Sequence, residues 1–446
     1  MTWQSLFTWQ VTLIKLRKQE KNISRYWYHN MLNKELHIEQ NFASRKQIVL
    51  TYYYVNILVC SIWILSPIIS VFAICLFLAY FNPSKNTYLF YFFLIAVAHG
   101  LVNYTKVPAS DLEMYNDTFK LYLDQNILQA GRTILLDPFF YYTSYFVTKL
   151  SFGNLPVVAL FWTIFTYYTF FYALYEYDKV FQSSNRLRLI FIVFFSFFIG
   201  LDFQLSAHLM RQSAALSLAM LGIAMYCRGK RIYRLFFVLA FLTHFSTVIF
   251  IPIIFLTRLR KHFLAIAVVV CMVLGYIVST LNILEVVNGL HLNPSNPLFA
   301  SITDRAQMYQ EKDDGGVTVR LMIEMLLYLL IAIYVLIRAG KLFEKKETAI
   351  GARRFLAIYM CFSIFVALIR NNLLLSLRYF FYLYHLSAFA IFTFSRVRSY
   401  VLFSFVLLLV FTAPVRYFKG LEASAFIYID NTVKLMSYNV FDFLSN

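Results

Sequence analysis

Long apolar segments recur along most of the chain and limit what it can fold into. Their typical length is about 20 residues, which is what an α-helix needs to cross the hydrocarbon core of a bilayer. The strands of a membrane β-barrel alternate apolar and polar residues, and these segments do not. The sequence therefore predicts an all-α, polytopic integral membrane protein with about 10–12 transmembrane helices. The apolar segments cover residues 50–81, 87–104, 154–176, 189–204, 209–227, 235–256, 263–281, 318–338, 355–374, 378–394 and 399–413.

Polar stretches divide the chain into three parts. Residues 1–47 form a basic tail, which we place in the cytoplasm, and residues 48–413 form the transmembrane domain. Two longer polar stretches of this domain, 105–153 and 282–316, are predicted to be loops on the outer, periplasmic face, and residues 414–446 form a C-terminal tail. Charged residues make up only 14% of the chain, against about 25% in soluble domains. The membrane therefore takes the place of a large soluble core.

Basic residues indicate the orientation, because the cytoplasmic loops of membrane proteins are enriched in lysine and arginine. The loop from Arg338 to Arg354 is strongly basic and is placed inside. Alternating the spans from this loop puts Arg211, at the head of segment 209–227, at the outer edge of the membrane. The net charge of +18 follows from this pattern of basic loops, so it requires no nucleic acid as a partner.

Segments 235–256 and 50–81 do not fit a simple alternation of spans. Basic clusters flank 235–256 on both sides, which calls for an even number of crossings, and this segment is too short for two spans at about 1.5 Å per residue. We predict a re-entrant hairpin that turns near His244; the alternative is a plain span with one basic loop outside. Segment 50–81 is either one span or a bent hairpin broken near Pro67, and the sequence leaves both open.

No cofactor or metal site is indicated. The five cysteines are scattered through the apolar segments and include no CxxC pair. The chain also lacks a Walker A sequence, an HExxH motif, a DxD-type metal pair and a GxSxG nucleophile elbow. We therefore expect a reaction that uses neither a metal ion nor an organic cofactor.

Arginines gather at the predicted outer face, where the orientation rule disfavours them. They include Arg211, Arg305 in the second outer loop and Arg378 near the outer turn 370–378. A planar guanidinium makes two parallel bonds to a phosphate group, so converging arginines suit a diphosphate. The alternative for Arg211 is a side chain that simply bends toward the lipid head groups. The pattern predicts an anionic ligand at the outer leaflet.

Carboxylates and aromatic rings accompany these arginines. Asp111 and Glu113 in the first outer loop are candidate general bases for a hydroxyl group, although most loop carboxylates are simply solvated. Aromatic residues make up 19% of the chain, and they suit both stacking on sugar rings and an interfacial belt. His244, within an apolar run, is either functional or a hydrogen-bonded structural histidine.

One stretch of the chain resembles a known family. Residues 208–256 contain HLMRQSAALSLAM, then a basic turn, then THFSTVIFIPIIFL. This order is similar to the signature of the EpsG-like polysaccharide polymerases, a group that includes bacterial O-antigen polymerases (Wzy). Arg211, Gln212, His244 and Ser246 match the signature in order and spacing.

Two other stretches match the same family more weakly. Asp111 and Tyr115 in SDLEMYNDTF resemble its acidic outer-loop segment, and Arg378 in LRYFFYLYHLSAF resembles its late arginine-aromatic helix start. The chain departs from the family in its long basic N-terminal tail and in Ser110, where the family often has glycine before the aspartate.

The resemblance implies a GT-C-like helical bundle in the bacterial inner membrane with glycosyltransferase activity at its periplasmic face. A growing glycan on undecaprenyl diphosphate would be transferred to the next lipid-linked repeat unit, in O-antigen (lipopolysaccharide) or exopolysaccharide synthesis. Asp111 is the first candidate for the base and His244 the second. The predicted site comprises Asp111, His244 and Arg211 as catalytic groups, and Arg211, Gln212, Arg305, Arg378, Tyr115 and Tyr309 as contacts to diphosphate or sugar.

The implied partners are the undecaprenyl-diphosphate-linked oligosaccharide and membrane lipid, with a chain-length regulator and a flippase as further candidates. Two other function classes stay open. A flippase or transporter of lipid-linked sugar would use similar cationic groups, although the internal repeats typical of transporters are not evident. A ligase of the O-antigen type would use the same donor with a different acceptor.

Overall fold

The computed structural model describes residues 50–81, 83–108, 111–133, 137–181, 209–257, 346–368, 373–396 and 432–445, with a few single positions between them. The chain divides into two compact units, Met1–Cys60 and Ser61–Asn446. The described part of the first unit, residues 50–60, is helical, and the following description concerns the second unit. Several predicted parts lie outside the described residues: tail 1–47, loop 282–316, and segments 189–204, 263–281, 318–338 and 399–413 for all but single positions.

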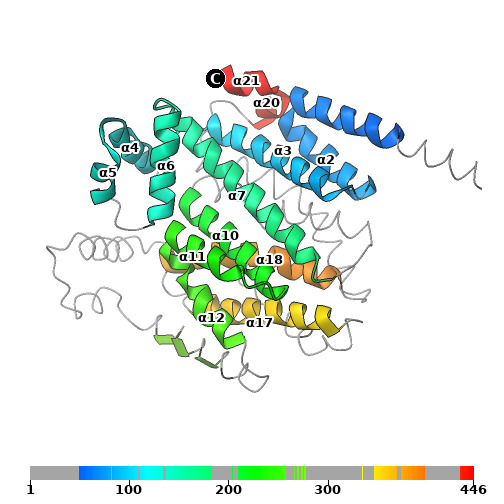
Figure 1. The fold of residues 1–446 in the computed structure, drawn as a ribbon, viewed down its shortest axis with the longest axis vertical. Helices are drawn as coiled ribbons and strands as arrows, with labels where there is room; N and C mark the ends of the chain where they lie inside the picture. Colours follow the sequence, from blue (N-terminus) through cyan, green and yellow to red (C-terminus); the bar gives the residue numbers. More distant parts are fainter. Residues whose placement is uncertain are drawn as a thin grey trace, which may run out of the picture. The chain divides into compact units, whose positions relative to one another are not determined.

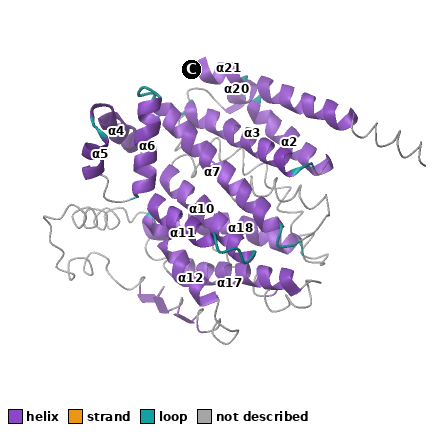
Figure 2. Ribbon diagram, in the orientation of Figure 1, coloured by secondary structure: helices purple, strands orange, loops and turns teal. Residues whose placement is uncertain are grey.

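Helices are the regular elements of the described residues (Figures 1 and 2), as the sequence predicted. Three of them, Lys85–Tyr104, Leu155–Asp178 and Glu347–Leu368, are long and apolar enough to cross a membrane. The total of 10–12 spans stays a prediction. In chain order the elements are α2 (Pro67–Phe81), α3 (Lys85–Tyr104), α4 (Asp111–Asp124), α5 (Ile127–Thr133), α6 (Pro138–Leu150), α7 (Leu155–Asp178), α10 (Met210–Cys227), α11 (Tyr233–Thr243), the 3-10 helix η2 (Phe245–Ile249), α12 (Phe250–Thr257), α17 (Lys346–Leu368), α18 (Leu373–Ser395), α20 (Thr432–Ser437) and α21 (Val440–Ser445).

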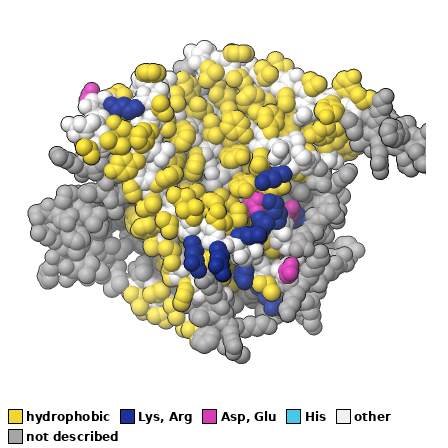
Figure 3. Space-filling model, viewed as in Figure 1, with side chains coloured by type: hydrophobic (Ala, Val, Ile, Leu, Met, Phe, Trp, Pro, Cys, Tyr) yellow, Lys and Arg dark blue, Asp and Glu magenta, His cyan; other side chains and the backbone are white. Residues whose placement is uncertain are grey.

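The described surface is largely apolar. Figure 3 shows hydrophobic side chains over most of one face, with the Lys and Arg side chains gathered mainly in one region. Such a surface is unfavourable in water and suits contact with lipid. Exposed large apolar side chains include Leu76, Phe90, Phe93, Leu235, Val238 and Phe255.

Helix α10 is at the centre of the second unit. Every one of its 18 residues is buried, and it packs against α7 and α11. Small residues along α10, such as Ser213, Ala214 and Gly222, let neighbouring helices approach closely, as is common in membrane bundles. Gly100 of α3 serves the same purpose, because an added Cβ would lie 2.8 Å from Leu160 Cδ1 of α7.

The predicted outer loop 105–153 is largely helical. In α4, the buried apolar residues Leu112, Tyr115, Phe119 and Tyr122 are three or four residues apart and so share one face. This face packs against α6 and α7 in a single apolar cluster. The loop is therefore held to the bundle by an apolar core that it shares with α7 and α10.

Helix α6 runs antiparallel to α7. Trp162 Nε1 donates a hydrogen bond of 2.9 Å to Ser144 Oγ, and the Phe139 ring lies 6.4 Å from that of Phe165. The first residues of α6 are therefore level with Phe165 of α7. Phe165 lies about ten residues from Leu155, where α7 begins, which is roughly 15 Å along the helix at 1.5 Å per residue. Asp137, directly before α6, therefore lies near the same level of α7.

Segment 235–256 forms the hairpin that the sequence predicted. Helix α11 ends at Thr243, His244 is extended (φ −158°, ψ 120°), and η2 and α12 follow. The Tyr226 ring lies 5.4 Å from Tyr233 at the start of α11, and its hydroxyl is 3.2 Å from Thr257 Oγ1 at the end of α12. Both arms thus end beside the C-terminus of α10, and the turn lies at His244.

Local hydrogen bonds explain why the chain breaks at His244. Thr243 Oγ1 donates to the carbonyl of Leu239, and Thr247 Oγ1 donates to the carbonyl of His244. Hydroxyl side chains that bond to the backbone compete with helical hydrogen bonds. A similar break occurs at Ser66, between a helical segment that ends at Leu65 and α2, which starts at Pro67. A break near Pro67 was one of the two alternatives that the sequence left open.

Ion pairs join the helices at the far end of the bundle from His244. Glu176, near the end of α7, pairs with Arg228 at the end of α10 and also with Lys179. Asp178 pairs with Arg396 at the end of α18. These contacts fix the ends of α7, α10 and α18 relative to one another, so that the opposite end of α10 is held in a defined position.

Candidate functional site

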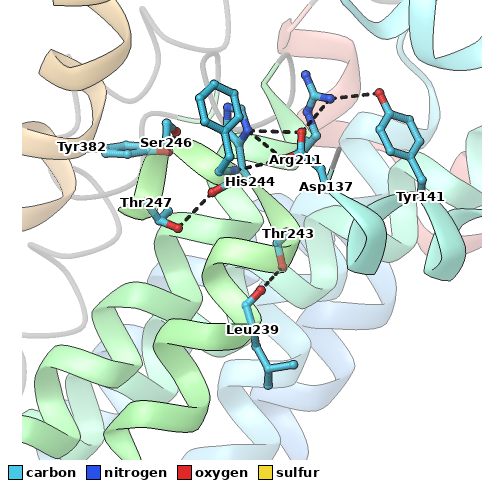
Figure 4. A network of polar contacts seen from close by, with 10 residues as sticks. Asp137, Tyr141, Arg211, Leu239, Thr243, His244, Ser246, Thr247 and Tyr382 are labelled. Carbon is cyan, nitrogen blue, oxygen red and sulfur yellow. Dashed lines mark hydrogen bonds and ion pairs between the residues drawn. The ribbon is translucent and has the colours of Figure 1, made fainter. Parts of the chain in front are cut away.

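Arg211 is held from several sides in the first turn of α10. Its Nη1 lies 2.9 Å from Asp137 Oδ2 and donates a hydrogen bond of 2.9 Å to the hydroxyl of Tyr141 (Figure 4). The guanidinium also lies against two aromatic rings, 5.8 Å from the centre of Tyr115 and 5.6 Å from that of Tyr141. Cation–π contacts of this kind favour a charged arginine. No partner for its Nε or Nη2 is present among the described residues.

Asp137 is the centre of this network. Its side chain is fully buried, and one carboxylate faces both Arg211 and His244, whose Nδ1 lies 3.3 Å from Oδ2 and 3.4 Å from Oδ1. The backbone N–H of Phe245 donates to Oδ1 at 2.9 Å. Burial raises the pKa of Asp137, but the hydrogen bond from His244 and the charge of Arg211 outweigh it and lower the pKa below its ordinary value. Asp137 is therefore an anion.

The backbone aims the carboxylate of Asp137 into the bundle. Asp137 adopts the left-handed conformation (φ 59°, ψ 49°) directly before Pro138, which starts α6. Few residue types other than glycine take this conformation, and aspartate is among those that tolerate it. The sequence analysis did not select Asp137. The local signal was an acidic residue before a proline at the head of an apolar helix, LLDPFF.

His244 lies at the tip of the hairpin, between α11 and η2, and is buried. Since a carboxylate only accepts hydrogen bonds, the facing Nδ1 of a neutral His244 carries the hydrogen. No partner for Nε2 is present among the described residues, so in this tautomer Nε2 is a proton acceptor.

A second set of contacts joins α18 to the same region. Gln212 Nε2 donates to the carbonyl of Arg378 at 2.9 Å, and the hydroxyls of Ser246 and Tyr382 share a hydrogen bond. Arg378 is half-buried and lies close enough for its charge to act on Tyr115. Both motif pairs therefore lie in one region, which is formed by α10, the hairpin and α18. The pairs are Arg211–Gln212 and His244–Ser246.

The predicted base Asp111 lies at the rim of this region. It is half-buried in the first turn of α4, and its charge acts on Arg211, Tyr115 and Lys106. Burial raises the pKa of Tyr115 to about 12, so its hydroxyl stays protonated. Arg305 and Tyr309 lie outside the described residues.

The structure thus brings Arg211, Gln212, His244, Tyr115 and Arg378 into one region. Arg211 pairs with Asp137, which directly precedes α6 and is level with the body of α7. The expected position of Arg211 at the outer edge of the membrane stays a prediction. Among the described residues, no group of three or more His, Cys, Asp and Glu side chains is arranged to hold a metal ion.

Comparison with known families identifies one family for this chain. The model of the EpsG family matches residues 86–429, which is most of the chain. The chain belongs to the EpsG family. No protein of curated function and no solved structure shows significant similarity to it.

Membership in the EpsG family indicates a polysaccharide polymerase in the membrane, with a lipid-linked sugar as substrate. The matched range contains Asp137, Arg211, His244 and Arg378, and it leaves out the basic N-terminal tail. The resemblance drawn from the sequence is therefore confirmed at the level of the family.

Proposed function

We propose that this EpsG-family protein is a glycosyltransferase that polymerises lipid-linked oligosaccharide repeat units at the periplasmic face of the bacterial inner membrane. The growing glycan leaves undecaprenyl diphosphate and joins the next lipid-linked unit, in O-antigen or exopolysaccharide synthesis. One observation carries this proposal. One carboxylate holds both a buried guanidinium and an imidazole, and among the described residues two nitrogens of the guanidinium and one nitrogen of the imidazole have no partner.

In the proposed reaction, the terminal hydroxyl of the acceptor unit gives its proton to His244 Nε2. The hydroxyl oxygen attacks the anomeric carbon of the donor's reducing-end sugar, and the bond from this carbon to the phosphate oxygen breaks. Undecaprenyl diphosphate leaves with the bonding electron pair. Since negative charge develops on the diphosphate, a preorganised cation near it gives the main stabilisation, and Arg211 supplies this cation through Nε and Nη2.

We assign supporting roles to the other predicted residues. Arg378 is a second cation for the diphosphate, and Gln212, Tyr115 and Tyr309 are contacts to sugar or phosphate, with Arg305 as a third cation. We prefer His244 over Asp111 as the base, because a base needs a fixed position at the reacting atoms. His244 lies at the centre of the buried network, whereas Asp111 is half-buried at its rim.

One feature supports a site that opens to the outer face. Both arms of the hairpin end near the basic turn after α10, and basic turns favour the cytoplasmic side. The opposite end of α10, with Arg211, would then face outward. A reaction that joins already assembled lipid-linked units is consistent with this side.

Deletion of the gene, followed by glycan profiling, tests the function. The polymerase predicts single repeat units on the surface glycolipid in the null strain, with chain length restored by the wild-type protein. A flippase predicts no surface repeat units, and a ligase predicts that polymerised chains accumulate on the lipid carrier. Wild-type chain length in the null strain would contradict all three.

A purified protein gives a direct test. Incubated in detergent with lipid-linked repeat units, the wild type should produce a ladder of longer lipid-linked glycans and release undecaprenyl diphosphate. His244→Ala should abolish the ladder. Arg234→Gln, an exposed change at the start of α11, should leave it unaltered.

A further inference from the structure

Asp137 makes contacts that go beyond a simple ion pair. Three groups converge on one carboxylate: the Arg211 guanidinium from α10, the His244 ring and the Phe245 backbone N–H from the hairpin. The carboxylate itself comes from the start of α6. Three separate elements therefore meet at Asp137, and its side chain has no exposed surface.

We propose that Asp137 is the positioning residue of the site: it fixes the tautomer and orientation of His244 and, at the same time, the orientation of Arg211. This inference rests on the proposed function. It adds a residue that the sequence motifs did not select.

The tautomer follows from hydrogen-bond chemistry. A carboxylate has no hydrogen to donate, so a neutral His244 must carry its hydrogen on Nδ1 to bond with Asp137. The lone pair is then on Nε2, the nitrogen without a partner among the described residues. Asp137 thus selects the form of His244 that accepts a proton from a hydroxyl.

The orientation of Arg211 follows from the use of its donors. Asp137 and Tyr141 both engage Nη1, at 2.9 Å in each case. The rings of Tyr115 and Tyr141 lie against the guanidinium and restrict its rotation. Nε and Nη2, which have no partner in the part of the chain that the structure describes, lie on one edge of the guanidinium plane, which is the geometry that binds phosphate in a bidentate way.

Charge balance gives Asp137 a further effect. With neutral His244, the pair of Asp137 and Arg211 carries no net charge. When His244 takes the proton, the imidazolium is next to the carboxylate and is stabilised by it, as the leaving diphosphate gains charge. Among the described residues, the charges that act on His244 are those of Asp137, Arg211 and Arg378, and the Tyr382 hydroxyl bonds to Ser246, two residues further along the hairpin.

Asp137→Asn tests the tautomer directly, because an amide can donate to Nδ1 and so move the ring hydrogen to Nε2. We expect kcat for glycan elongation to fall on the order of 10²-fold or more, the range of general-base catalysis. We also expect the acid limb of the pH–rate profile to move to lower pH, since the charge that favours protonated His244 is gone. A normal kcat with an unshifted profile would overturn the proposal.

A matched control separates positioning from folding. Asp178 is also an aspartate paired with an arginine, Arg396, but at the far end of the bundle. Asp178→Asn should lower thermal stability while leaving the pH–rate profile of the folded enzyme in place. If Asp137→Asn changed stability in the same way, with no change in kcat or profile, Asp137 would have only a structural role.

A second variant keeps the test valid if Asp137→Asn does not fold. Asp137→Glu retains the carboxylate but moves it by one methylene. We expect a folded protein with reduced kcat and a wild-type pH–rate profile, whereas wild-type kcat would contradict a positioning role. If the wild-type protein shows no elongation, the proposed function is wrong. If elongation requires His244 but not Asp137, only the role of Asp137 is wrong.

Discussion

Asp137 and His244 are 107 residues apart in the chain, yet the carboxylate of one lies 3.4 Å from Nδ1 of the other. The same carboxylate lies 2.9 Å from Nη1 of Arg211. This relationship joins the two residue pairs singled out in the sequence, Arg211–Gln212 and His244–Ser246, through a residue that belongs to neither.

Arg211→Lys tests whether the site needs the two parallel N–H donors of the guanidinium or only its positive charge. A lysine keeps the charge and a bond to Asp137, but it loses the planar fork. Since a hydrogen bond to a charged group contributes about 1.5–3 kcal/mol, elongation should fall roughly 10–100-fold while the protein level is unchanged. The measurement is the rate of ladder formation, with Arg234→Lys as the exposed control. Full activity of Arg211→Lys would reduce Arg211 to a membrane anchor.

Tyr141→Phe removes one hydroxyl from the network and keeps the ring against Arg211. The lost hydrogen bond is charge-assisted, so we expect elongation to drop about tenfold, mainly through a poorer orientation of the guanidinium. Tyr142→Phe on the next position of α6 is the matched control. Equal activities of the two variants would show that the Tyr141 hydroxyl contributes nothing to the site.

Lys106 should make the stability of the protein depend on pH. Burial lowers its pKa to about 7, and the charge of Asp111 opposes this only in part. A lysine in the unfolded chain titrates near 10.5. Between these two values the unfolded state binds more protons than the folded state. The free energy of unfolding should therefore rise with pH in this window, by at most about 1.4 kcal/mol per pH unit.

Thermal unfolding at a series of pH values checks this expectation. Below about pH 7 both states are protonated and the cost of burying the charge is fully present. Lys106→Met should flatten the rise in stability above this pH and should stabilise the protein most at low pH. Lys120→Met, at an exposed position, should leave the pH dependence as in the wild type; the same slope in both variants would rule out Lys106 as its source.

The hairpin predicts which positions share one side of the membrane. Single cysteines at residue 231 before α11 and at residue 260 after α12 should react with an impermeant reagent only when the cytoplasmic side is open. A cysteine in place of Phe152, which is 97% exposed in the turn between α6 and α7, should react from the opposite side. Labelling of residue 260 from the outer side alone would exclude the re-entrant hairpin.

Much of this architecture was readable from the sequence. The apolar segments predicted an all-α membrane protein, because only helices and closed barrels satisfy backbone groups in lipid. The basic clusters on both sides of 235–256 predicted the hairpin and its turn at His244. The outer loop 105–153 was read as polar, although the spacing of Leu112, Tyr115 and Phe119 already indicated an amphipathic helix.

The choice between two acidic residues of that loop was decided by tertiary structure. The resemblance to the family pointed to Asp111 as the base, and no sequence motif pointed to Asp137. Only the antiparallel packing of α6 on α7 carries Asp137 down to Arg211 and leaves Asp111 at the rim. The sequence by itself determined the helices, the break at His244 and the arginine that needs a counter-charge. Which carboxylate provides that charge depends on contacts between distant segments, which no local pattern contains.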